Sequence, residues 1–136
     1  MVYYTKLGQT GPAVSRIALG SDVQIPPSDF LPVLRRGWEL GINFVDTDRT
    51  YGYQDPTTGR GQVWEAIRRW LAEVDRSKVV VATKTYEPSF EGALKDVEQA
   101  RVGLGTDYLD VFMLHGLNTL EDWERFQPAL RGPYGG

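Results

Sequence analysis

Short apolar runs alternate along the chain with longer stretches of helical periodicity. The apolar runs occupy residues 17–20, 43–47, 78–84 and 109–114. Residues 79–82 are continuously apolar, which is typical of a parallel strand covered on both faces. The alternation predicts an α/β fold with about four βα units around a parallel sheet.

Two helices are expected between the first three strands. The first begins at Ser28 or Asp29 and ends near Gly41, which suits a left-handed cap. The second covers residues 61–74, where apolar residues at i, i+4, i+7, i+8 and i+11 form one stripe. The apolar residues expected to pack from the first helix are Phe30, Leu34 and Trp38.

A third helix is expected to begin near Ser89 and to end at Gly103 or Gly105. A fourth is expected from Thr119, because residues 119–122 read TLED, a possible capping box. The apolar residues expected to pack from the third helix are Phe90, Leu94, Val97 and Leu104.

The two ends of the chain have different patterns. Residues 3–6 and 13–15 flank the turn-rich segment 7–12, which reads LGQTGP, so a β-hairpin is expected before the first parallel strand. Residues 128–136 are rich in proline and glycine and are expected to fray.

Length and composition predict one globular domain over residues 1–136. The 136 residues are 41% hydrophobic and 24% charged, which is ordinary for a folded domain. The sequence contains no apolar run near the roughly 20 residues that a membrane helix needs. The first residues do not resemble a secretion signal, so we expect a cytoplasmic protein without membrane contact.

Cysteine, histidine and net charge exclude several kinds of site. The chain has no cysteine and one histidine, which excludes disulfides, zinc–thiolate sites and multi-histidine metal sites within it. Its formal net charge of −3, with no basic run, gives no footprint for nucleic acid. No metal and no nucleic-acid partner are therefore expected.

Four polar side chains follow or end the predicted strands. Asp46 ends the second strand, Tyr51 lies in the loop after it, Lys84 ends the third strand and His115 follows the fourth. In βα barrels the carboxyl ends of the strands share one mouth, where the reacting groups gather. These four residues are therefore the candidate catalytic site.

The four residue types suit carbonyl reduction. A tyrosine with a lowered pKa can donate a proton to a developing alkoxide, a lysine favours its phenolate, an aspartate holds the lysine charged, and a histidine orients the carbonyl. Other interpretations stay open. Asp46 with Lys84 can be a buried structural ion pair, His115 a structural residue, and Lys84 a Schiff-base lysine.

Several segments resemble the aldo-keto reductases, in order and at plausible spacing from residue 4 to about 123. Residues 4–11 read YTKLGQTG and 14–20 read VSRIALG, like the opening of that family. The remaining matching segments are 41–47 (GINFVDT), 51–52 (YG), 81–84 (VATK), 104–110 (LGTDYLD) and 114–115 (LH).

This resemblance implies the N-terminal half of a (β/α)8 TIM barrel and NADPH-dependent reduction of a small aldehyde or ketone. It implies Tyr51 as the general acid, Lys84 and Asp46 as the residues that tune it, and His115 as the residue that orients the carbonyl. Asp48 stands where many relatives have a small residue, and it brings an extra charge close to the site.

The larger departure from the family is length, since a full barrel takes typically ~250 residues. In relatives the later strands and loops hold most of the cofactor. Those strands and loops have no counterpart among the four strands that the sequence predicts. The alternative is therefore a catalytically silent, truncated relative that acts through protein contacts. Open sheet edges also suggest a homodimer.

Overall fold

The computed structural model describes residues 2–54 and 61–130. The strands are β1 (Tyr4–Lys6), β2 (Ala13–Ser15), β3 (Leu19–Gly20), β4 (Phe44–Asp46), β5 (Val80–Thr85) and β6 (Val111–Leu114). The helices are α1 (Pro27–Glu39), α2 (Val63–Leu71), α3 (Phe90–Leu104) and α4 (Leu120–Leu130), with a 3₁₀ turn η1 (Arg76–Lys78). Within the described ranges no helix is both long and apolar enough to span a bilayer.

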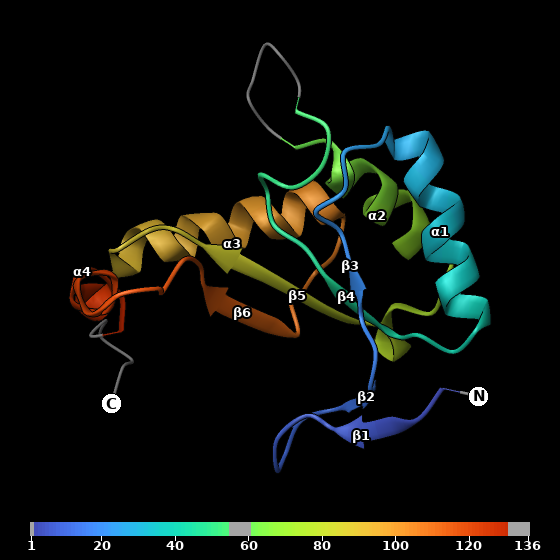
Figure 1. The fold of residues 1–136 in the computed structure, drawn as a ribbon, viewed down its shortest axis with the longest axis horizontal. Helices are drawn as coiled ribbons and strands as arrows, with labels where there is room; N and C mark the ends of the chain where they lie inside the picture. Colours follow the sequence, from blue (N-terminus) through green and yellow to red (C-terminus); the bar gives the residue numbers. More distant parts are fainter. Residues whose placement is uncertain (1, 55–60, 131–136) are drawn as a thin grey trace.

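The strands form two sheets. β1 and β2 make an antiparallel hairpin, and β3, β4, β5 and β6 form a parallel sheet in chain order. Helices α1, α2 and α3 lie together along one face of the parallel sheet, and the hairpin lies near the end of α1, beyond the amino ends of the parallel strands (Figure 1). The expected hairpin followed by four βα units is confirmed.

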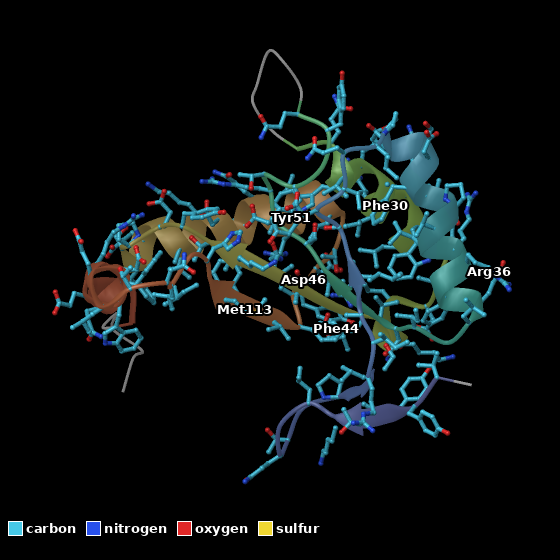
Figure 2. All side chains as sticks on the ribbon, in the orientation of Figure 1. Phe30, Arg36, Phe44, Asp46, Tyr51 and Met113 are labelled. Atoms are coloured by element: carbon cyan, nitrogen blue, oxygen red, sulfur yellow. The ribbon has the colours of Figure 1, made fainter. Side chains whose placement is uncertain are left out.

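The core lies between the parallel sheet and the helices, because side chains alternate between the two faces of each strand. Val45 and Val81 are fully buried toward the helices, where Trp70 is also fully buried. Phe44 and Met113 lie on the other face, away from the helices (Figure 2). Helices therefore cover one face of the parallel sheet, and the opposite face corresponds to the inside of the partial barrel that the sequence predicts.

The third helix begins and ends as expected, and the fourth begins as expected. The Ser89 hydroxyl accepts a hydrogen bond from the Gly92 N–H at 3.1 Å, and Gly105 caps α3 with φ +65°. At α4 the Thr119 hydroxyl accepts from the Asp122 N–H at 3.1 Å, and the Asp122 carboxylate accepts from the Thr119 N–H at 2.9 Å. The predicted capping box is confirmed.

The first two helices have different limits from those expected. α1 begins at Pro27 rather than at Ser28 or Asp29, because a proline suits the first helical position, where no N–H is needed. α2 is shorter than residues 61–74 at both ends. Gly41 does adopt a positive φ of +92° after α1, as predicted.

Three further expectations are wrong in detail. Residue 78 lies in the 3₁₀ turn η1, and the third parallel strand begins at Val80. Leu94 is 52% exposed, because it lies over edge strand β6 rather than over the core. Residues 128–130 are helical rather than frayed, since α4 continues to Leu130; residues 131–136 lie outside the described residues.

Asn43 joins the hairpin to the amino ends of the parallel strands. Its buried side-chain carbonyl accepts from the Ser15 N–H at 2.7 Å, and its side-chain amide donates to Ala13 O at 3.0 Å and to Lys78 O at 3.2 Å. One side chain therefore connects β2, the start of β4 and η1. These bonds close the end of the sheet that lies opposite the candidate site.

We expect Asn43→Ala to lower the free energy of unfolding by about 2–4 kcal/mol, because it leaves buried backbone groups unpaired. Urea unfolding, followed by tryptophan fluorescence, measures the change. Asn118→Ala, at an exposed position, is the matched control and should change stability by less than about 0.5 kcal/mol. Equal losses in the two variants would contradict this role of Asn43.

Candidate active site

Asp46 and Lys84 meet at the carboxyl end of the parallel sheet. Asp46 pairs in register with Ala82, so Lys84 lies two residues further along β5 on the same face. Lys84 Nζ lies 2.8 Å and 2.9 Å from the two carboxylate oxygens of Asp46 and donates to Thr47 O at 3.1 Å. The Lys84 side chain is only 11% exposed, so its charge is held by these three oxygens.

The contacts of Lys84 keep it protonated. Burial is the largest single effect and lowers its pKa, but hydrogen bonding to Asp46 and Tyr51, with the attraction of Asp46, outweighs burial and raises the pKa above 10.5. A Schiff-base lysine must be a neutral amine when it attacks a carbonyl. The raised pKa therefore weighs against the aldolase-like interpretation of Lys84.

Tyr51 lies in the loop after β4, against both Lys84 and His115. Its N–H donates to Asp48 O at 3.2 Å, and Gly52 follows with φ +88° and no room for a side chain beside Val63. Lys84 Nζ lies 4.6 Å from the centre of the Tyr51 ring. The Tyr51 hydroxyl lies 3.3 Å from His115 Nε2.

His115 continues the ladder beyond β6, where its N–H donates to Thr85 O at 2.8 Å. This backbone bond fixes its place beside the end of β5. The structure thus brings Asp46, Tyr51, Lys84 and His115 together at one end of the sheet, and Figure 2 shows Asp46 and Tyr51 near the middle of the molecule.

Tyr86 is a member of the cluster that the sequence analysis did not name. Its ring lies 4.3 Å from the His115 ring at an angle of 31°, and its hydroxyl is 3.4 Å from His115 Nε2. Burial first, and then the negative charge of Asp48, raises the pKa of Tyr86 above 10.0, so the phenol stays protonated at neutral pH. The sequence signal that could have found Tyr86 is its position two residues after Lys84, because residues i and i+2 of a strand point to the same face.

Asp48 is fully buried in the same loop. One carboxylate oxygen, Oδ1, accepts from the Thr50 N–H at 2.9 Å and from the Thr50 hydroxyl at 2.7 Å, as in an Asx turn. Its other oxygen, Oδ2, lies 3.3 Å from His115 Nδ1. The extra charge noted in the sequence therefore lies against the histidine.

Asp96 of α3 anchors the two loops that carry the cluster. Its carboxylate accepts from the Thr85 hydroxyl at 2.6 Å and pairs with Arg49 at 3.0 Å. The Thr85 hydroxyl in turn accepts from the Glu87 N–H at 2.9 Å. The loops after β4 and β5 are thus held from the helical side.

The model of the Aldo/keto reductase family matches residues 16–130. The chain belongs to this family. The uncharacterized oxidoreductase YrpG of Bacillus subtilis is 29% identical to this aldo/keto reductase chain, over 94% of the chain and 45% of YrpG. The L-galactose dehydrogenase of Arabidopsis thaliana is 28% identical, over 82% of the chain and 37% of that protein.

Solved structures agree on the fold. The aldo-keto reductase AKR11C1 from Bacillus halodurans, in a holo form, matches with a TM-score of 0.75 at 22% identity, over 96% of this chain and 45% of that one. The predicted fold class, a partial TIM barrel, is confirmed. This aldo/keto reductase chain spans less than half the length of the two curated relatives above.

The backbone at the mouth leaves room for the reacting end of a cofactor. Gly20, in register with Asp46, has open space where a side chain would stand. The hydroxyl of the next residue, Ser21, is buried and has no hydrogen-bond partner among the described residues. Across residues 2–54 and 61–130, no group of three or more potential metal ligands occurs.

We expect Asp46→Asn to lower the pKa of Lys84 below its value in the unmodified chain, since burial remains while the opposite charge is lost. Titration of the lysine side chain by NMR, with selective isotope labelling, measures this. Asp110→Asn is the matched control. It removes a carboxylate just before β6 that forms another partly buried ion pair, with Arg76 of η1. An unchanged Lys84 titration in Asp46→Asn would show that the ion pair does not set its charge.

Proposed function

We propose that this chain takes part in the NADPH-dependent reduction of a small aldehyde or ketone, with Tyr51 as the general acid. The observation that carries the proposal is the position of the Lys84 ammonium, which is paired with Asp46 and lies against the Tyr51 ring. A fixed positive charge beside a phenol favours the phenolate that remains after proton donation.

The proposed reaction assigns one task to each side chain. When bound, NADPH supplies the hydride that reduces the carbonyl carbon. The Tyr51 hydroxyl gives its proton to the carbonyl oxygen, which becomes the alcohol, and Lys84 stabilises the phenolate. His115, 3.3 Å from the Tyr51 hydroxyl, binds the same carbonyl oxygen and orients it.

The relatives support this reaction class. YrpG is named an oxidoreductase and the Arabidopsis protein an L-galactose dehydrogenase. NADPH is the cofactor that we assign from the family resemblance, with Gly20 beside its nicotinamide ring. The chain covers less than half of these relatives, and its described residues form part of the walls of the proposed substrate pocket.

We further propose that a second copy of the chain supplies part of those walls. Among the described strands, β3 and β6 each pair on one side only. Beside β6 an apolar groove of about 250 Å³ lies between α3 and the strand. The residues that line it are Thr85, Phe90, Ala93, Leu94, Val97, Phe112, Met113 and Leu114. Unpaired edges and open apolar surface both favour association.

Replacement of Tyr51 tests the acid. We expect Tyr51→Phe to lower kcat by about 10²–10⁴-fold, because the proton donor is lost, and to leave NADPH affinity unchanged in a fluorescence titration. Tyr53→Phe, which removes an exposed phenol two residues away, is the control and should keep full turnover. Equal turnover in the two variants would exclude Tyr51 as the acid. The absence of NADPH binding at millimolar concentration would favour the silent relative.

Sedimentation velocity over a range of concentrations tests the second copy. We expect the sedimentation coefficient to rise with concentration, and Leu94→Lys to suppress the rise by placing a charge in the groove. Val102→Lys, at an exposed apolar position outside the groove on the same helix, is the control and should associate normally. A constant monomer value at every concentration would contradict self-association.

A further inference from the structure

Two buried polar atoms face each other at the edge of the cluster. Asp48 Oδ2 and His115 Nδ1 are both buried, and neither makes a hydrogen bond of standard geometry within the described part of the chain. They lie 3.3 Å apart. The other oxygen of Asp48 already accepts two hydrogen bonds from Thr50, so the carboxylate is fixed in place.

A proton on Nδ1 would face Asp48 Oδ2, and a small adjustment of the ring would turn this contact into a hydrogen bond that serves both atoms. A buried carboxylate oxygen without a donor is costly, and so is a buried ring nitrogen without a partner. The two nearby cations are held by other carboxylates, since Lys84 pairs with Asp46 and Arg49 pairs with Asp96. The imidazole is therefore the group that is placed to give Asp48 Oδ2 its hydrogen bond.

We propose that Asp48 is a positioning residue that holds a proton on Nδ1 of His115. The other ring nitrogen, Nε2, then carries a lone pair whenever the imidazole is neutral. In that form it accepts a hydrogen bond from the hydroxyl of Tyr51 or Tyr86, which lie at 3.3 Å and 3.4 Å. It donates a hydrogen bond only as the imidazolium.

The aromatic neighbours fix the ring whose Nδ1 faces Asp48. Tyr86 stacks on the imidazole at 4.3 Å, and Tyr51 meets it edge-on at 5.7 Å and 81°. The titratable groups around the ring are Asp48 and Tyr51 from the loop after β4, Asp46 and Lys84 at the strand ends, and Tyr86 after β5. From α4, Arg125 donates to the carbonyl of Tyr86 at 3.0 Å.

The consequence for catalysis rests on the proposed function. A carbonyl oxygen can be oriented by Nε2 only when Nε2 carries a proton, and the fixed Nδ1–H makes that state the imidazolium. Asp48 thus determines which charge state of His115 is competent to bind the substrate oxygen.

The sequence contains a single histidine, so its ring nitrogens can be observed without assignment. After selective ¹⁵N-histidine labelling, two-bond ¹⁵N–¹H NMR spectra at alkaline pH identify which nitrogen of the neutral ring is protonated. We expect the Nδ1–H form in the unmodified chain. A neutral ring protonated on Nε2 would overturn the proposal, whether or not the chain reduces carbonyls.

Variants separate the hydrogen bond from general effects of the loop. We expect Asp48→Ala to invert the tautomer to Nε2–H, because Nε2 faces two phenol oxygens while Nδ1 loses its acceptor. Asp48→Asn keeps one acceptor oxygen, which the Thr50 N–H requires, so the amide NH₂ turns toward Nδ1 and should also favour the Nε2–H form. Thr50→Val disturbs the same turn but leaves Asp48 Oδ2 in place, so it should keep the Nδ1–H form.

Each outcome bears on the proposal. Inversion of the tautomer in Thr50→Val as well as in Asp48→Ala would overturn it, since the loop rather than the carboxylate would then set the proton. If Asp48→Ala fails to fold, the unmodified chain and Asp48→Asn decide the question. Nε2–H in the unmodified chain, or Nδ1–H in Asp48→Asn, contradicts the proposal.

A pH profile of the reduction adds an independent measurement. We expect the pH profiles of kcat/KM in the unmodified chain and in Asp48→Ala to differ, because only in the variant does the neutral ring keep its Nε2 proton. Identical profiles would overturn the catalytic role of Asp48. An Nδ1–H tautomer in a chain without reductase activity would support the inference while contradicting the proposed function.

Discussion

The parallel register between β4 and β5 is the constraint on which the rest of the structure depends. Because both strands run the same way and Asp46 pairs with Ala82, their carboxyl ends meet at one edge of the sheet, and Lys84 shares a face with Asp46. A shift of one residue would turn Lys84 toward the buried core, where Val81 lies. The register therefore decides both the packing of the helices and the existence of the cluster.

Two aspartates two residues apart have opposite surroundings, and this contrast organises the charges of the site. Asp46 gives both oxygens to the Lys84 ammonium, whereas Asp48 divides its oxygens between a backbone turn and the histidine. The lysine and the histidine thus each have their own carboxylate, while Asp96 holds the loops from behind. The rings of Tyr51 and Tyr86 both contact the His115 ring, and the Tyr51 ring also lies 4.6 Å from Lys84 Nζ.

The sequence predicted the features that depend on local pattern. Periodicity located the four parallel strands, and residue type at the strand ends located Asp46, Tyr51, Lys84 and His115. The structure shows that these four residues lie close together, and their catalytic roles stay predictions.

Features that depend on three-dimensional neighbours were not predicted from the sequence. The stacking of Tyr86 on His115 comes from loop geometry, and the exposure of Leu94 from its place over an edge strand. The start of α1 was missed because Pro27 outweighed the side-chain caps.

Asn43 has a consequence for the order in which the chain acquires its structure. Its side-chain partners lie 28, 30 and 35 residues away along the chain, so each of these bonds closes a long loop and carries the entropy of that closure. The hairpin is synthesised before η1, yet its side-chain anchor is complete only after Lys78 has been made and η1 has docked. The hairpin thus becomes secure only after segments that are made later.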